Sequence, residues 1–406
     1  MASAVSGSQQ TGRELNAFGL RLMAELGESG SNCVLSPFSI AVALAMAEEG
    51  AVGDTAAEIR AALDFTERSS SSLKELSQAF EASLETASPK ASTAYNAEST
   101  SPQDGVQLLL MTANRLFADV RFPLSAGFVR SMDEMFGAKP ERLSFSSNVE
   151  AARATINRWV EQQTAERIQD LIPEGGVTVD TALVLVNALF FKAAWLSGFD
   201  ASQTQPRPFT LDNKETVEVP MLNGTKKAGY QADETLRVLA LPYVGGDFEL
   251  LIILPAEDSS LDAIVPQITG EFLSTAATGA TVDVAITLPK IEMRSPSLKL
   301  SGALQRLGVE SAFDIPPGAA DFSPMFEPGT DRTGVEEVYH KTFLLIDEEG
   351  SEAAAATAVV IGRLSMPAPD EGPVHFVVDR PFFFAIRHRP TGAALFLGRI
   401  FDPRGL

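Results

Sequence analysis

One stretch of the sequence, residues 182–191, restricts the possible folds more than any other. It reads ALVLVNALFF and is rich in β-branched and aromatic residues. A run of this kind is typical of a strand that is buried on both faces. The run is too short to span a bilayer, and it contains Asn187. We therefore expect a globular protein with a buried sheet, and a hydrophobic content of 45% supplies its core.

Helical and extended patterns are divided unevenly along the chain. Apolar residues at helical spacing, with Ser36 before Pro37 as one N-cap signal, predict helices over residues 13–26, 38–47, 54–63, 72–87 and 149–168. The second half is rich in predicted strands, at residues 217–221, 238–242, 248–254, 282–288, 343–346, 376–378, 382–387 and 394–400. This distribution predicts an α+β fold.

The domain organisation is expected to be simple. The length of 406 residues fits one large domain, which we expect to cover residues 13–406. Residues 1–12 are small and polar and predict a loose, flexible N-terminus. Residues 88–105 are rich in Ser, Thr, Ala and Pro without periodicity. We interpret them as an insertion in a surface loop rather than a linker, because apolar patterning resumes directly afterwards.

The charge balance argues against several classes of partner. The chain has 53 acidic and 32 basic residues, a formal net charge of −21. Nucleic acid, heparin-like polyanions and anionic membranes all require clustered Lys and Arg, so we expect none of them as partners. The predicted helix at residues 72–87, in particular, is acidic on balance.

Cysteine usage and the N-terminus add two further limits. Cys33 is the one cysteine, so neither an intrachain disulfide nor a multi-cysteine metal site is possible, and we expect a buried, inert thiol. The first residues have neither a basic start nor an apolar segment. They show no signal peptide, which leaves the compartment open between a secreted protein that has lost its signal and an intracellular one.

An enzyme is not expected. The sequence has no Gly-x-Ser-x-Gly elbow, no His-Glu-x-x-His zinc helix and no Gly-rich phosphate or dinucleotide loop. Of its three histidines, His340 begins a predicted strand and is interpreted as structural. We therefore predict no catalytic residues, no metal and no cofactor.

The segment of residues 347–367 has an unusual composition. It reads DEEGSEAAAATAVVIGRLSMP, with an Ala-rich first half and a β-branched second half. One interpretation is a short Ala helix that leads into a surface turn. The other is a segment with two conformations, whose small side chains allow it to enter a sheet as a strand. If Ser351 faces inward, the period of two places the following residues on the same side: Ala353, Ala355, Thr357, Val359 and Ile361.

Several motifs occur in an order and at a spacing that resemble the serpin family from about residue 13 to 403. They are NCVLSPFSI at 32–40, GAVGDT at 50–55, NALFFKAAW at 187–195, LPY at 241–243, LPK at 288–290, VYHK at 338–341, DEEG at 347–350, DRPFFFAIR at 379–387 and FLGR at 396–399. The resemblance implies a serpin fold, with helices packed around a large central, mostly antiparallel sheet, smaller sheets, and an exposed reactive-centre loop at residues 348–367. It also implies a monomer.

The resemblance further implies a mechanism. A target serine protease cleaves the loop and forms an acyl-enzyme. The freed loop then inserts into the central sheet before water hydrolyses that bond, so the inhibitor is a metastable suicide substrate. The open alternatives are a non-inhibitory serpin that acts as a carrier or chaperone and, outside the family, an unrelated acidic enzyme or interaction protein.

Site residues follow from the matching motifs. The resemblance implies a hydrogen-bonded cluster beneath the central sheet, and it places Trp195 in the sheet-opening region. The cluster comprises Ser36, Ser39, Asn187 and His340. The hinge of the loop is expected to comprise Glu348, Gly350, Ser351, Ala353, Ala354, Ala355 and Ala356. This hinge carries no bulky or proline residue, which favours an inhibitory member.

Two adjacent bonds compete as the bait. The usual loop length of the family, counted from Glu348, predicts cleavage between Leu364 and Ser365 by chymotrypsin-, elastase- or subtilisin-like proteases. The loop is also similar to that of antithrombin with one residue deleted, which predicts cleavage between Arg363 and Leu364. Because a trypsin-like pocket buries a guanidinium against a carboxylate, our first choice from the sequence is Arg363 with trypsin-like targets.

Overall fold

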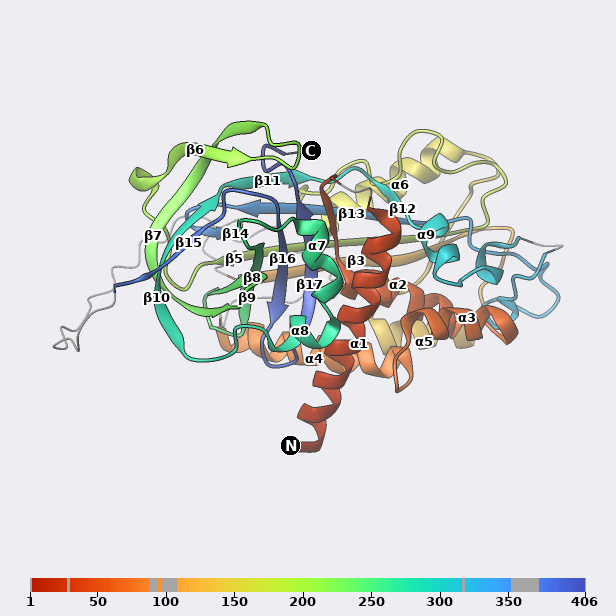
Figure 1. The fold of residues 1–406 in the computed structure, drawn as a ribbon. Coiled ribbons are helices and arrows are strands. Elements are labelled where there is room, and N and C mark those ends of the chain that lie inside the picture. Colours follow the sequence, from red (N-terminus) through yellow and green to blue (C-terminus); the bar gives the residue numbers. More distant parts are fainter. Residues whose placement is uncertain are drawn as a thin grey trace.

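The fold comes from a computed structural model, which describes residues 2–27, 30–87, 94–95, 108–315, 318–351 and 372–405 (Figure 1). The side chains of residues 2–6, 94 and 95 are not described. The α-helices in this part are α1 (Ala2–Leu26), α2 (Pro37–Glu49), α3 (Gly53–Leu63), α4 (Ser69–Ala87), α5 (Ala126–Phe136), α6 (Val149–Gln163), α7 (Leu261–Ile264), α8 (Gly270–Thr275) and α9 (Ser301–Arg306). None of the helices in these ranges has the length and apolarity that crossing a bilayer requires.

One sheet of nine strands is built largely from the second half of the chain. Its order is β1-β17-β16-β9-β8-β7-β10-β15, and β6 pairs with β7. The strands are β1 (Cys33–Leu35), β6 (Gln205–Thr210), β7 (Thr216–Ala232), β8 (Leu236–Pro242), β9 (Phe248–Pro255), β10 (Thr281–Pro289), β15 (Val374–Val377), β16 (Phe382–His388) and β17 (Ala393–Ile400).

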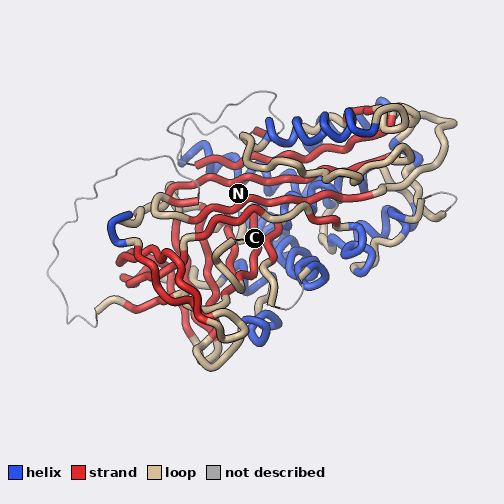
Figure 2. Tube along the Cα trace, turned by 90° about the horizontal axis from the view of Figure 1, so that it is seen from above, coloured by secondary structure: helices blue, strands red, loops and turns tan. Residues whose placement is uncertain are grey.

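The second sheet, of eight strands, contains the buried apolar run at residues 182–191. Its order is β11-β13-β5-β3-β2, with β12 on β13, β14 on β5 and β4 on β3. In Figure 2 its long strands run side by side across the molecule. The strands are β2 (Ala94–Tyr95), β3 (Leu108–Asp119), β4 (Glu141–Leu143), β5 (Leu183–Ala194), β11 (Ile291–Arg294), β12 (Leu298–Lys299), β13 (Glu337–Ile346) and β14 (Gly350–Ser351).

Strand β5 is buried on both faces, as its sequence predicted. Alternate residues belong to two different cores. Leu183, Leu185 and Leu189 join the larger core on the side of α2, whereas Val184 and Val186 join a smaller core with residues of α6. Figure 1 shows α6 on one side of these strands and α2 to α5 on the other. The continuous apolar run therefore serves two layers at once.

Of the predicted helix boundaries, those of α1 and α6 are wrong by five residues or more. Helix α1 begins at Ala2 instead of residue 13, so the segment expected to be loose is helical. Tertiary contacts explain this: Thr11 is buried, and a Cβ on Gly12 would lie 2.2 Å from the Thr391 carbonyl oxygen. Helix α6 ends at Gln163 instead of residue 168, because Ala165 and Glu166 have positive φ angles of 50° and 62°. Most of the predicted insertion at residues 88–105 lies outside the described residues, apart from strand β2.

Candidate functional site

Strands β5 and β13 pair along only part of their length. Their parallel ladder runs from Glu337 opposite Val184 to Thr342 opposite Leu189. Both strands continue beyond this point, β5 to Ala194 and β13 to Ile346, without pairing with each other. The seam between the two central strands is thus closed at one end and open at the other.

The first residues of the predicted hinge lie at the open end of this seam. Gly350 and Ser351 form the short strand β14, which pairs antiparallel with Ala194 and Ala193 of β5. A glycine is required here, because a Cβ on Gly350 would lie only 1.9 Å from the Ala193 carbonyl oxygen. Ser351 is buried, and its hydroxyl lies 2.6 Å from the hydroxyl of Tyr243 in the larger core. The side chain of Ser351 therefore faces inward.

The Glu348 carboxylate anchors the start of the hinge. One oxygen accepts a hydrogen bond of 2.8 Å from the Thr204 hydroxyl, and the other pairs with Lys290 Nζ at 2.8 Å. The Glu348 backbone oxygen also accepts from the Phe199 N–H at 2.7 Å. Burial opposes the charged form of Glu348, but the bonds from Lys290 and Thr204 outweigh it and hold the pKa of this carboxyl below its usual range.

Trp195 joins the end of β5 to the backbone of the hinge. Its indole N–H donates to the Asp347 carbonyl oxygen at 2.8 Å, and its backbone N–H donates to the Glu349 carbonyl oxygen at 2.8 Å. The indole stacks on the Tyr243 ring with a centroid separation of 4.6 Å and an interplanar angle of 7°. Trp195 and Tyr243 thus form one aromatic floor beneath the point where the hinge enters the sheet.

The four residues of the predicted polar cluster lie together, at the closed end of the seam. Asn187 of β5 and His340 of β13 are partners in the ladder. The Asn187 side-chain oxygen accepts from His340 Nδ1 at 2.5 Å and from the Ser39 hydroxyl at 2.8 Å. Ser36 caps α2, with its hydroxyl oxygen accepting from the Ser39 N–H at 3.2 Å. The cluster therefore ties both strands to the start of α2.

The hydrogen bonds of His340 fix its tautomer. The Ser36 N–H donates to His340 Nε2 at 3.1 Å, so Nε2 is the acceptor and Nδ1 carries the proton. The ring is fully buried, and burial lowers the pKa of His340 to about 3. A second proton on Nε2 would place two N–H donors, those of His340 and Ser36, face to face without an acceptor. His340 is therefore neutral and structural in this position.

Several predicted site residues cannot be placed. The hinge residues Ala353, Ala354, Ala355 and Ala356 and the bait residues Arg363, Leu364 and Ser365 lie outside the described residues. Glu348, Gly350, Ser351 and Trp195 lie at the open end of the seam, whereas Ser36, Ser39, Asn187 and His340 lie at its closed end.

Four residues that complete these arrangements were not predicted from the sequence. Tyr243, Thr204 and Lys290 hold the hinge, and Asn114 accepts a hydrogen bond of 2.7 Å from the Asn187 amide. Tyr243 and Lys290 occur in the quoted motifs LPY and LPK, but the partners of each are distant in the sequence. Asn114 could have been noticed as a polar residue within an apolar strand, because such a residue needs a buried partner.

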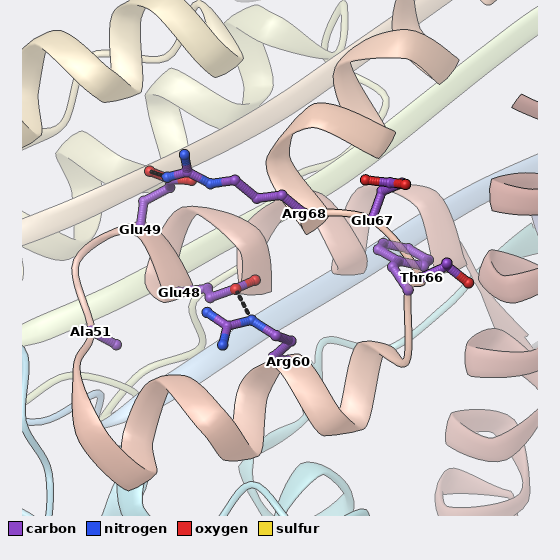
Figure 3. Close-up of a pocket in the computed structure, with 8 residues that line it drawn as sticks. Glu48, Glu49, Ala51, Arg60, Thr66, Glu67 and Arg68 are labelled. Atoms are coloured by element: carbon purple, nitrogen blue, oxygen red, sulfur yellow. Dashed lines mark hydrogen bonds and ion pairs between the residues drawn. The ribbon is translucent and has the colours of Figure 1, made fainter. Parts of the chain in front are cut away.

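A polar hollow elsewhere on the surface is lined by two ion pairs. It lies between α2, α3 and the start of α4 (Figure 3). Glu48 pairs with Arg60 at 2.9 Å, and Glu49 pairs with Arg68 at 2.6 Å. Within the described ranges, no group of three or more His, Cys, Asp or Glu side chains is arranged to hold a metal ion. The seam between β5 and β13 is the feature that the predicted residues share.

Comparisons with known proteins identify the class. The family model described as "Serpin (serine protease inhibitor)" matches residues 13–403, so the chain belongs to the serpin family. It is 38% identical over 381 residues to the leukocyte elastase inhibitor of Bos taurus, covering 92% of this chain and 93% of that protein. It is 35% identical to serpin B6 of Pongo abelii, covering 95% and 97%. The crystal structure of Manduca sexta serpin-12 has a TM-score of 0.80 at 26% identity, covering 97% and 98%.

These matches confirm the predicted serpin fold and the assignment to protease inhibitors rather than enzymes. They do not extend to the target preference that Arg363 suggested. Several of these relatives are named leukocyte elastase inhibitor, and such names do not support a preference for trypsin-like targets.

Proposed function

We propose that the chain inhibits serine proteases as a suicide substrate, by inserting its cleaved loop between β5 and β13. The observation that carries this proposal is the pairing of Gly350 and Ser351 with β5 where that strand separates from β13. The hinge already makes the first contacts of an added strand. Its direction is antiparallel to β5, so the rest of the loop can extend the same ladder.

The register predicts where each loop residue goes. Ser351 stands opposite Ala193, so each step along the loop moves one residue back along β5. Thr357 then stands opposite Asn187, and Ile361 stands opposite Leu183 at the start of the strand. The inward side chains alternate with Ser351 and include no charge: Ala353, Ala355, Thr357, Val359 and Ile361. Insertion therefore meets little desolvation cost.

Insertion must open the closed end of the seam. The ladder from Val184 to Leu189 has to separate, and the hydrogen bond between Asn187 and His340 has to break. In return, an inserted strand pairs with β5 on one side and β13 on the other. Because a net backbone hydrogen bond contributes about 1 kcal/mol, the added pairs favour insertion by several kcal/mol once cleavage frees the loop.

Cleavage supplies the trigger. The serine of the protease attacks the carbonyl carbon of the bait residue, and the peptide bond breaks with loss of the new amino terminus. The serine of the protease is then joined by an ester bond to the bait residue, at the end of the shortened loop. Insertion carries this ester to the far end of β5 before water reaches it. The protein supplies no catalytic group to this reaction, and it is consumed.

We assign the bait to the bond between Leu364 and Ser365. The names of the relatives support elastase-like targets, and an apolar Leu364 suits the apolar pockets of elastase- and chymotrypsin-like proteases. The family's loop length supports the same bond. Arg363 then precedes the bait residue instead of filling the specificity pocket.

Incubation with chymotrypsin, and separately with trypsin, tests this proposal. We expect a band at the combined mass on a denaturing gel with chymotrypsin, together with a released peptide that starts at Ser365. If trypsin forms a stable covalent complex and the released peptide starts at Leu364, the bait residue is Arg363 instead. Complete cleavage by both enzymes without any covalent band would refute inhibition by this mechanism.

A further inference from the structure

The two ends of the reactive-centre loop are held by different sheets. On the entry side, Gly350 and Ser351 pair with β5 of the eight-stranded sheet. On the exit side, the chain continues into β15, which pairs in parallel with β10 of the nine-stranded sheet. The position of one end relative to the other therefore depends on contacts that connect the two sheets.

Residues 196–204, which follow β5, hold the entry end. The Phe199 backbone N–H donates to the Glu348 carbonyl oxygen at 2.7 Å, and the Thr204 hydroxyl donates to the Glu348 carboxylate at 2.8 Å. This segment is supported by β7, because the ammonium of Lys226 lies 4.9 Å from the centroid of the Phe199 ring. Strand β7 thus carries the segment that binds the start of the hinge.

Asn223 of β7 binds the same segment one residue before Thr204. Its amide nitrogen donates to the Gln203 carbonyl oxygen at 3.0 Å and to the Met221 carbonyl oxygen at 2.8 Å. One hydrogen of the amide is therefore used towards the segment, and the other is used within β7 itself.

The side-chain oxygen of Asn223 binds the exit side. Thr287 of β10 stands opposite Asn223 in the ladder, and its hydroxyl donates to Asn223 Oδ1 at 3.0 Å. The Thr287 carbonyl oxygen accepts from the backbone N–H of Val378, directly after β15, at 2.8 Å. The side-chain amide of Asn223 thus connects the segment that binds the entry end to the strand that holds the exit end.

We propose, on the basis of the proposed function, that Asn223 is a positioning residue that fixes the spacing between the two ends of the reactive-centre loop. Fixed ends reduce the number of conformations of the free loop, so less conformational entropy is lost when a protease binds it. Loss of the Asn223 amide loosens both ends at once and slows cleavage of the loop.

Hydrogen exchange of the native chain tests the connection between the ends. The test variant is Asn223→Ala, and the matched control is Thr225→Ala, which changes an exposed residue on the same face of β7. We expect Asn223→Ala to raise the exchange rates of the Phe199 and Val378 backbone N–H groups about fivefold. Thr225→Ala should leave both exchange rates unchanged.

A second pair of variants isolates the bond to the exit side. Thr287→Val removes the hydroxyl and keeps the shape of the side chain, whereas Thr287→Ser keeps the hydroxyl. We expect Thr287→Val to raise the exchange rate at Val378 and Thr287→Ser to match the unmodified chain. Because the two residues share one hydrogen bond, Asn223→Ala combined with Thr287→Val should equal Asn223→Ala alone.

The rate at which chymotrypsin cleaves the loop tests the consequence for the protease. We expect Asn223→Ala to lower kcat/KM for this cleavage about threefold, and Thr225→Ala to leave it unchanged.

Two results would overturn the inference. Faster exchange at only one of the two positions in Asn223→Ala, or at neither, would show that Asn223 does not connect the ends. Faster exchange at both positions with an unchanged cleavage rate would show that the spacing of the ends does not serve the protease. If chymotrypsin cleaves the unmodified chain without forming a covalent complex, the proposed function fails, whereas the exchange and cleavage rates still decide the role of Asn223.

Discussion

The two ends of the seam between β5 and β13 are built differently. At the open end, side chains hold the backbone of a separate segment: Trp195 and Lys290 bind the hinge, and Tyr243 binds Ser351. At the closed end, the strands pair with each other, and Asn187 and His340 tie them to α2. Under the proposed function, the first arrangement would guide a strand into the sheet, whereas the second would resist the separation that a complete insertion needs. We therefore expect the barrier to insertion to lie beneath the sheet, away from the hinge.

The largest effect is expected from a charge at the open end. Ser351→Arg would bury a guanidinium against Tyr243, so the hinge could not stay in the sheet. We expect no band for the covalent complex with chymotrypsin on a denaturing gel. Chymotrypsin should instead cleave the variant as an ordinary substrate and be released in active form. Glu349→Arg is the matched control, because the Glu349 side chain is exposed. Undiminished complex formation by Ser351→Arg would contradict the role of the hinge.

A change at the closed end should act on stability instead. Asn187→Ala removes the acceptor of His340 and Ser39 and the donor to Asn114, all of them buried. We expect a loss of about 3 kcal/mol in the free energy of unfolding, measured by denaturant titration. The initial cleavage rate of the loop by chymotrypsin should not change. A variant as stable as the unmodified chain would show that the cluster does not hold the seam.

Acidification should lower the free energy of unfolding, because His340 at the closed end is buried in its neutral form. Its pKa is about 3 when folded, and the ordinary value is 6.5, so the unfolded chain binds more protons between pH 6.5 and 3. Stability is then complete above pH 6.5 and falls as the pH decreases, by about 2 kcal/mol at pH 5. His388, also buried with a pKa of about 3, adds a similar loss.

Denaturation at pH 7 and pH 5 measures this loss. His340→Gln should lose less stability than the unmodified chain over this interval, because one of the two buried histidines is gone. His375→Gln is the control for the replacement of a histidine, since His375 is exposed. An identical loss in His340→Gln would exclude His340 as the group responsible.

The smallest effect is expected from the ion pair at the open end. Lys290→Met breaks the contact with Glu348, but the Lys290 side chain is 39% exposed and solvent screens the pair. We expect a destabilisation of less than about 1 kcal/mol in the free energy of unfolding, measured by denaturant titration. A loss comparable to that of Asn187→Ala would mean that the open end carries more of the barrier than this comparison allows.

Much of the fold could be predicted because local patterns agree with tertiary packing. The run at β5 is apolar on both faces, and Ser36 before Pro37 caps α2. The boundaries of α1 and α6 could not be predicted, because contacts with Thr391 and the turn at Ala165 decide them. At α1, tertiary structure overrides the local signal.

The site was predictable only in part. The motifs supplied His340 and Asn187, but the contact between Tyr243 and Ser351 joins residues 108 positions apart. No local pattern encodes such a pairing. The prediction of Arg363 as the bait residue is not supported, for a different reason. A single side chain indicates which pocket it fits, but the position of the scissile bond depends on the register of the whole loop.

Unfolding of the intact and the loop-cleaved chain tests the central claim most directly. If the loop inserts between β5 and β13, the net gain of several kcal/mol from the added backbone pairs should raise the unfolding temperature of the cleaved protein by roughly 5 °C or more. The cleavage is made with a catalytic amount of a protease that cuts within the loop, and mass spectrometry confirms the cut. An unchanged or lower unfolding temperature after a confirmed cut would contradict insertion.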